Sequence, residues 1–162
     1  MQQGMHDMDS TMGPDMMRSH YRMLALNLAI SLVIMYVVMF AMIYTLGEFI
    51  QNINFFYMAL MMWAPMGSLM LLTMASMYKN KRLNIVLHAT FGLIFILSFV
   101  GIREQGLVGN KQFLRSMIPH HSGAILMCEK SSISDPAIAR LCDGIVAGQK
   151  AEIAEMKALL AR

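Results

Sequence analysis

The residues best suited to chemistry lie in one run near the C-terminal end of the chain, MIPHHSGAILMCE, which begins at Met117. In a helix, Met117 lies on the same side as the histidines three and four residues later, His120 and His121. Met127 and Cys128 return toward that side two turns further on, because residues seven apart nearly eclipse. Imidazole, thioether and thiolate donors suit Cu(I) and similar soft ions. Alone, the run therefore predicts half of a soft-metal site.

A simpler interpretation of the same run stays open. Methionine or cysteine at helical spacing most often packs in a protein core, and one histidine on such a face is most often a hydrogen-bonded core residue. Adjacent histidines with sulfur on both sides are rarer, so the pattern favours metal binding.

The composition indicates a membrane protein. Of the 162 residues, 57% are hydrophobic and 14% are charged, whereas a soluble domain carries about 25% charged residues. The net charge of +3 is small and scattered, which argues against a nucleic-acid partner. The 20 methionines are far above ordinary usage.

The N-terminal residues 1–22 are polar and have no buried apolar pattern, so we expect a mobile tail rich in methionine and histidine. They do not resemble a signal peptide, because no short apolar core with a small-residue cleavage site begins the chain. A tail of this composition can collect soft metal ions. Its candidate ligands are Met5, His6, Met8 and Met12.

Three long apolar runs predict a three-helix transmembrane region over residues 23–102, with membrane lipid as its surroundings. Each run lacks charged residues and is long enough to cross a hydrocarbon core of about 30 Å. Pro65 should kink the second helix or leave a backbone carbonyl free. The predicted spans are residues 24–46, 55–78 and 83–102.

The distribution of lysine and arginine predicts the orientation. Lys79, Lys81 and Arg82 lie in the loop after the second span, whereas the loop after the first span has neither residue type. Positively charged loops stay on the cytoplasmic side. We therefore expect a multi-pass protein of the bacterial cytoplasmic membrane, with its amino terminus inside and residues 103–162 in the periplasm.

Residues 103–162 predict one helical hairpin. The first helix should run over about 111–130, and the sequence SSISDP connects it to the second. Ser134 or Asp135 caps the second helix, with Pro136 in its first turn. The second helix should continue to the end of the chain. Its predicted inward stripe consists of Ile138, Leu141, Cys142, Ile145, Gln149, Glu152, Ile153, Met156 and Leu160.

Folding this hairpin about residue 134 gives the metal site a second wall. The antiparallel register brings Cys128 near Cys142 and places the histidines opposite residues 147–149. The two cysteines either form one disulfide, which is favoured outside the cytoplasm, or add thiolate ligands. Sulfur, imidazole and one carboxylate together fit Cu(I) or Ag(I), and the histidines could hold Cu(II) after oxidation. The candidate metal ligands are Met117, His120, His121, Met127, Gln149, Glu152 and Met156.

A ferritin-type di-iron site is the rival hypothesis. Such a site uses Glu-x-x-His pairs and additional inward glutamates. The chain contains no Glu-x-x-His, and Met117 stands where the glutamate would be. Sulfur in place of oxygen argues against iron.

Two segments, FLRSMIPHHSGAILMCEK and DPAIARLCDGIVAGQKAEIAEMKALL, resemble the ferritin-like family catalogued as domain of unknown function 305. The resemblance covers about residues 111–160 and rests on a Met-Ile-Pro-His-His-x-x-Ala-Ile-x-Met run and a later Gln-x-x-Glu-Ile-x-x-Met run. The preceding spans look like those of membrane-anchored members, some of which are similar to copper- or silver-handling proteins. The resemblance implies Met117, His120, His121, Met127 and Met156 as ligands.

Many members of that family carry the helical motif twice and complete a four-helix bundle within one chain, whereas this chain carries it once. A two-helix hairpin has little core of its own. We therefore predict an all-α protein whose hairpin dimerises into a four-helix bundle. Small residues that would permit close approach of helices are Gly144, Gly148, Ala151 and Ala158.

The function predicted from these features is soft-metal binding for sequestration, tolerance or transfer, with a copper chaperone or an efflux protein as a partner. No nucleophile–base pair, phosphate loop or metal-hydrolase motif is visible, so nothing in the sequence requires catalysis. The alternatives are a copper-dependent oxidoreductase and an accessory subunit of a larger membrane complex.

Overall fold

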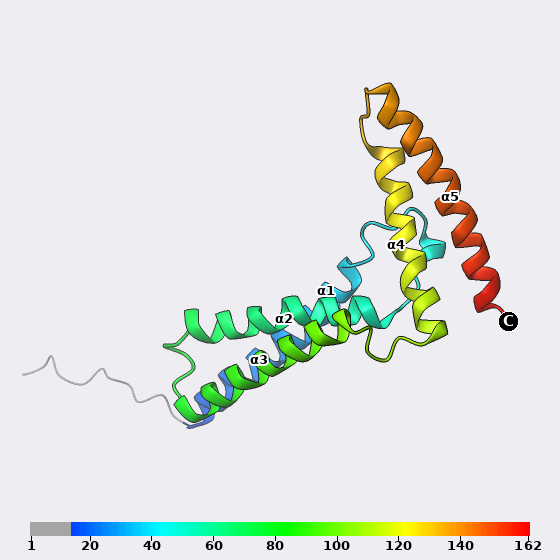
Figure 1. The fold of residues 1–162 in the computed structure, drawn as a ribbon. Coiled ribbons are helices and arrows are strands. Elements are labelled where there is room, and N and C mark those ends of the chain that lie inside the picture. Colours follow the sequence, from blue (N-terminus) through cyan, green and yellow to red (C-terminus); the bar gives the residue numbers. More distant parts are fainter. Residues whose placement is uncertain (1–13) are drawn as a thin grey trace, which may run out of the picture.

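The computed structural model describes residues 14–162, and this part of the chain is entirely helical. In Figure 1, α1, α2 and α3 run along a common direction, and the α4–α5 pair stands across one end of them. The elements are α1 (Pro14–Val38), the 3-10 turn η1 (Leu46–Glu48), α2 (Ile53–Thr73), α3 (Lys81–Arg103), α4 (Asn110–Lys130) and α5 (Pro136–Leu160).

The first three helices are long and apolar enough to cross a membrane. Their most apolar windows have mean hydropathies of 1.8, 1.6 and 2.4, and most side chains in these windows face outward. A helix of 21 residues such as α2 is about 32 Å long at 1.5 Å per residue, which matches a hydrocarbon core. Outward-facing apolar side chains are what a lipid environment allows.

The ends of these helices differ from the predicted spans. α1 begins at Pro14, inside the predicted tail of residues 1–22, and it ends at Val38, before the end of the predicted span 24–46. Proline is favoured at the first position of a helix, whereas residues 39–42 form turns and residues 43–45 lead irregularly into η1 instead of continuing α1. Hydropathy detects apolar length, and the helix ends depend on turn and cap geometry that it does not measure.

The other two helices start earlier than predicted because asparagine side chains cap them. The Asn52 side chain accepts a hydrogen bond from the Phe55 amide, so α2 starts at Ile53 and ends at Thr73, compared with the predicted span 55–78. Asn80 caps α3 in the same way. The predicted span 83–102 therefore becomes Lys81–Arg103, and α2 continues through Pro65 without ending there.

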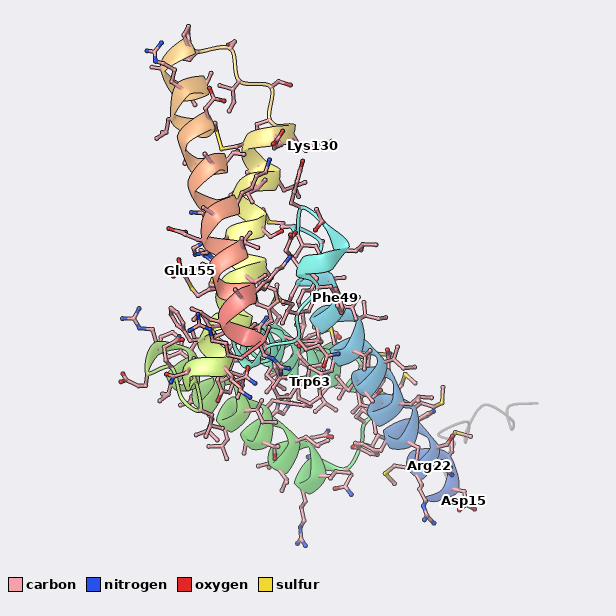
Figure 2. The ribbon with its side chains drawn as sticks, turned by 90° about the vertical axis from the view of Figure 1, so that its right-hand side faces the viewer. Asp15, Arg22, Phe49, Trp63, Lys130 and Glu155 are labelled. Carbon is pink, nitrogen blue, oxygen red and sulfur yellow. A yellow bond between two sulfur atoms is a disulfide. The ribbon has the colours of Figure 1, made fainter. Side chains whose placement is uncertain are left out.

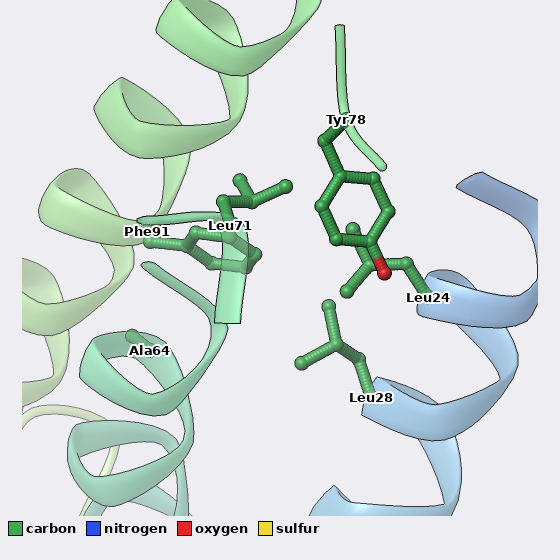
Figure 3. Packing of buried hydrophobic residues seen from close by; sticks show 6 residues of the cluster. All are labelled: Leu24, Leu28, Ala64, Leu71, Tyr78 and Phe91. Atoms are coloured by element: carbon green, nitrogen blue, oxygen red, sulfur yellow. The ribbon is translucent and has the colours of Figure 1, made fainter. Parts of the chain in front are cut away.

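The α2 helix lies at the centre of this region and packs against α1 and α3. Gly67 permits close approach of α3, since a Cβ atom there would lie 2.6 Å from Cζ of Phe91. The Trp63 indole donates a hydrogen bond of 2.7 Å to the Leu28 carbonyl of α1. Figure 3 shows the buried cluster between these helices, formed by Leu24, Leu28, Ala64, Leu71, Tyr78 and Phe91.

The α4–α5 hairpin has the capped connection that the sequence predicted. Asp135 accepts hydrogen bonds from the amides of Ala137 and Ile138, and Pro136 begins α5. A disulfide joins Cys128 to Cys142 near the connection, with their Cα atoms 5.4 Å apart (Figure 2). The apolar core between the helices is small and consists of Ile118, Ile125, Ile153 and Met156.

The predicted inward stripe of α5 is wrong at its first two positions. Ile138 and Leu141 are 50% and 62% exposed. Leu141 precedes Cys142, which the disulfide fixes toward α4, and successive residues in a helix point about 100° apart. Near the connection the stripe therefore turns away from α4.

The loop between α1 and α2 covers one side of the hairpin through a buried carboxylate. Glu48 accepts hydrogen bonds of 2.8 Å from the Thr45 amide and from the Ser122 hydroxyl of α4. The Ser122 oxygen also accepts from the Tyr44 amide at 2.6 Å. Lys157 of α5 reaches Glu48 at 3.4 Å. We call these five residues the Glu48 clasp; it connects the three-helix region to both helices of the hairpin.

Candidate metal centre

His121 and Glu152 face each other across the hairpin. Nδ1 of His121 on α4 lies 2.9 Å from Oε2 of Glu152 on α5. The His121 side chain is only 14% exposed, whereas the Glu152 side chain is 54% exposed. Gln149, one turn before Glu152, donates a hydrogen bond of 3.4 Å to the same carboxylate oxygen. The antiparallel register thus brings together three of the predicted ligands.

The imidazole nitrogen between these residues is not fully satisfied. Nδ1 of His121 is buried and has no directed hydrogen bond, although the Glu152 oxygen is close enough for one. Most buried polar atoms in proteins have a partner with good geometry. An imidazole nitrogen and a carboxylate oxygen that converge without such a bond form a donor pair that can bind a metal ion.

His120 points away from this pair. Its side chain belongs to an exposed residue, and its ring centroid lies 6.0 Å from that of His121 with the ring planes tilted by 59°. The separation follows from the helix, since neighbouring side chains diverge by about 100°. The two histidines therefore serve different surfaces of α4.

The predicted sulfur ligands also divide between two environments. Met156 is 8% exposed and belongs to the apolar core of the hairpin, and Met117 packs partly buried against that core. Met117 lies one turn before His121, and Met156 lies one turn after Glu152, so both border the His121–Glu152 pair. Met127 is 52% exposed and stands seven residues after His120 on the outer surface.

Within the described part of the chain, histidine, cysteine, aspartate and glutamate side chains alone do not complete a metal site. Residues 14–162 contain no group of three or more histidine, cysteine, aspartate and glutamate side chains that could hold a metal ion. Cys128 and Cys142 are joined to each other, so they offer no thiolates in this state. A complete coordination shell must therefore include thioether, amide or second-chain ligands. The proposed tail ligands Met5, His6, Met8 and Met12 lie outside the described residues.

An open face extends from this site along the hairpin. Phe113, His120 and Met127 recur every seven residues along α4, and Ile138, Ile145, Glu152 and Leu159 do so along α5. The α5 stripe contains Glu152 and so lies on the side of the metal site, whereas Lys157, which belongs to the Glu48 clasp, lies on another side of α5. The α4 stripe lies about 100° around that helix from His121, on its exposed surface. The large apolar residues exposed on this open face are Phe113, Met127, Ile138, Leu141 and Leu159.

The Glu48 clasp was not predicted from the sequence. Glu48 is 7% exposed and is the one charged residue in the loop between α1 and α2. A lone carboxylate in an uncharged segment between two apolar spans is the signal that could have identified it, because a buried charge needs partners. Burial raises the pKa of Glu48, but the hydrogen bonds from Ser122 and Thr45 and the charge of Lys157 outweigh burial and lower it.

Comparison with known proteins covers both parts of the chain. The family model described as "Domain of unknown function (DUF305)" matches residues 102–160. The "Uncharacterized protein L153" of Acanthamoeba polyphaga mimivirus is 33% identical over 118 residues, which cover 72% of this chain and 76% of that protein. An alignment of this length necessarily includes α2 and α3 as well as the start of α4. No solved structure matches the chain.

Proposed function

The chain belongs to the DUF305 family, and from that premise we propose that it is a membrane-anchored protein that binds copper or silver for sequestration, tolerance or transfer. The observation that carries the proposal is the His121–Glu152 pair, whose buried imidazole nitrogen lacks a directed hydrogen bond. The thioethers of Met117 and Met156, each one turn from the pair on its own helix, bias the site toward Cu(I) and Ag(I), because soft ligands select soft ions.

The position of the site favours exchange of the ion over permanent storage. Glu152 is more than half exposed, and His120 and Met127 offer an imidazole and a thioether on the open face. An incoming ion can bind these accessible donors before it reaches His121. A copper chaperone or an efflux protein would approach the same face.

The proposed location is the outer side of a bacterial cytoplasmic membrane, with the amino terminus inside. The support is the cluster of Lys79, in the connection from α2 to α3, with Lys81 and Arg82 in the first turn of α3, at the end of the three-helix region away from the hairpin. The disulfide between Cys128 and Cys142 is consistent with an oxidising compartment.

The proposed assembly is a homodimer in which two hairpins complete a four-helix bundle. The hairpin core is small, and large apolar side chains of the open face are exposed to solvent. At Gly144 and Gly148 an added Cβ atom would meet nothing within 4 Å, so a second helix could approach α5 closely. A dimer formed through the open face would enclose His120 and Met127 of both chains beside the two His121–Glu152 pairs.

Titration of the purified full chain with Cu(I) in mild detergent tests metal binding. We expect stoichiometric binding that is lost in the His120→Ala/His121→Ala double variant and kept in a His20→Ala control, whose histidine lies at the far end of α1. Equal binding by all three proteins would contradict the site. Binding accompanied by oxidation of an added electron donor would favour the copper-dependent oxidoreductase, and absence of binding would favour the accessory subunit.

A further inference from the structure

A cavity of about 430 Å³ opens beside the first turns of α1, facing the connection from α2 to α3. Arg18 and Arg22 of α1 and Leu83 of α3 contribute to its lining. Figure 2 shows Asp15 and Arg22 at the end of α1 that lies far from the hairpin. The cavity is therefore separate from the candidate metal centre and needs an explanation of its own.

The wall of this cavity is held in place by hydrogen bonds between helices. The Tyr21 hydroxyl donates to Oδ1 of Asn84 at 2.7 Å, and the Asn84 amide donates to the Tyr78 carbonyl at 2.6 Å. The rings of Tyr21 and Tyr78 lie 5.3 Å apart. These contacts connect α1 to the start of α3. Tyr21, which lines the cavity, is thereby held against the start of α3.

The charge around the cavity is strongly positive. Arg18 and Arg22 are one turn apart on α1, so their guanidinium groups share a face. Neither forms an ion pair with any residue in the range 14–162. Lys79, Lys81 and Arg82 belong to the same end of the three-helix region. Unpaired arginines one turn apart can bind a phosphate through paired hydrogen bonds.

The cavity also has an apolar side. Ala25 and Leu83 line it where the apolar parts of α1 and α3 begin. Both helices pack against α2 and make no comparable contact with each other. A ligand that suits the whole site therefore combines a phosphate with a hydrocarbon chain.

We propose that this cavity binds the headgroup phosphate of an acidic phospholipid, with Arg18 and Arg22 on the phosphate and an acyl chain beside Ala25 and Leu83. Basic pockets between membrane helices on the cytoplasmic side are suited to such lipids. The site depends on association of α1–α3 with a membrane and is independent of metal binding by the hairpin. Lipid held there would stabilise the contact between α1 and α3.

Native mass spectrometry of the full chain in mild detergent tests the proposal with phosphatidylglycerol and phosphatidylcholine as probes. We expect phosphatidylglycerol to be retained at least ten-fold better than phosphatidylcholine. The Arg18→Gln/Arg22→Gln variant should lose this preference. The Lys79→Gln/Arg82→Gln variant should keep it, because it removes the same charge from the same end without changing the lining of the cavity.

A second variant tests whether the shape of the cavity matters in addition to its positive charge. Ala25→Phe should fill part of the cavity while both arginines remain, and phosphatidylglycerol retention should fall with unchanged helix content by circular dichroism. Equal losses in the two charge variants would overturn the proposal in favour of general surface attraction. Displacement of the lipid by millimolar inorganic phosphate would overturn it in favour of a free-anion site. Unchanged retention in Ala25→Phe would also contradict it.

Discussion

The buried polar groups on the two sides of the α4–α5 hairpin differ in their hydrogen bonding: those on the side covered by the α1–α2 loop have partners, and the imidazole nitrogen on the open side lacks one. On the covered side, the buried Glu48 carboxylate accepts hydrogen bonds from Thr45 and Ser122 and meets Lys157. On the open side, the buried His121 nitrogen faces the Glu152 carboxylate without a directed hydrogen bond. A satisfied buried network fixes a structure, whereas an imidazole nitrogen without a directed hydrogen bond, beside a half-exposed carboxylate, remains available for a ligand. We therefore expect the covered side, with Glu48, to stabilise the fold and the open side, with His121 and Glu152, to bind the metal ion.

The largest expected change comes from breaking the covered side. Glu48→Ala leaves the fully buried Ser122 hydroxyl without its acceptor and removes the part-buried hydrogen bond from the Thr45 amide. An unsatisfied buried group such as this hydroxyl costs about 1–3 kcal/mol. Lys157 adds little because its side chain is 40% exposed. We expect the hairpin to unfold at lower denaturant concentration, measured by far-ultraviolet circular dichroism, with the Cu(I) affinity of the folded protein unchanged.

The matched control for that variant is Glu155→Ala, which removes an exposed carboxylate of α5 outside the clasp (Figure 2). Its effect on stability should stay within about 0.5 kcal/mol. If Glu48→Ala abolished metal binding in the folded state, the separation of roles between the two sides would be wrong.

On the open side, Glu152→Gln should change metal binding and leave folding intact. The substitution keeps the shape of the side chain and removes the hard carboxylate oxygen that faces His121. Because Cu(II) accepts oxygen and nitrogen ligands better than Cu(I) does, we expect about a ten-fold loss of Cu(II) affinity and a smaller loss for Cu(I). Competition titrations with chelators of known affinity measure both. Unchanged affinities for both ions would mean that the carboxylate does not bind the metal.

Much of the hairpin was predictable because its determinants are local. The Asp-Pro pair at residues 135–136 predicts the start of α5, and folding about residue 134 brings Cys128 to Cys142. The predicted register places the histidines opposite residues 147–149, whereas the structure places His121 opposite Glu152, about one turn further along α5. Short-range spacing is enough to derive the connection and the disulfide, and it finds the facing residues to within about one turn.

The Glu48 clasp, the direction of Leu141 and the end of α1 depend on tertiary contacts, which sequence spacing does not reveal. Glu48 and Lys157 are 109 residues apart in the sequence, so only the assembled fold brings them together. The outward direction of Leu141 follows from the disulfide at the next residue, and the end of α1 at Val38 follows from the turns that lead into the clasp. Tertiary packing decided each of these features.

Acid should weaken the covered side before it affects the apolar core. The pKa of Glu48 is lowered in the folded protein, below the ordinary value of 4.5, so the ionised carboxylate stabilises the native state. That contribution is fully present above pH 4.5 and is lost as the pH falls through the lower folded value. Hydrogen exchange at the Tyr44 and Thr45 amides should accelerate over this window. Glu48→Gln should remove most of the pH dependence, and a persistent dependence would identify another titrating group.

The smallest effect on folding should come from the open face, at Leu141. This side chain is 62% exposed, so Leu141→Gln should alter the free energy of unfolding of the monomer by less than about 0.5 kcal/mol. In a dimer formed through this face the same residue would be buried, and a buried leucine contributes about 1.5–3 kcal/mol relative to an exposed one. Sedimentation equilibrium in density-matched detergent should therefore show a weaker dimer for Leu141→Gln and an unchanged one for Arg140→Gln. A dimer that is indifferent to Leu141 but broken by Ala151→Leu would place the interface on the face of α5 that carries Ala151 and Ala158. The open face would then stay accessible to a protein that exchanges metal with it.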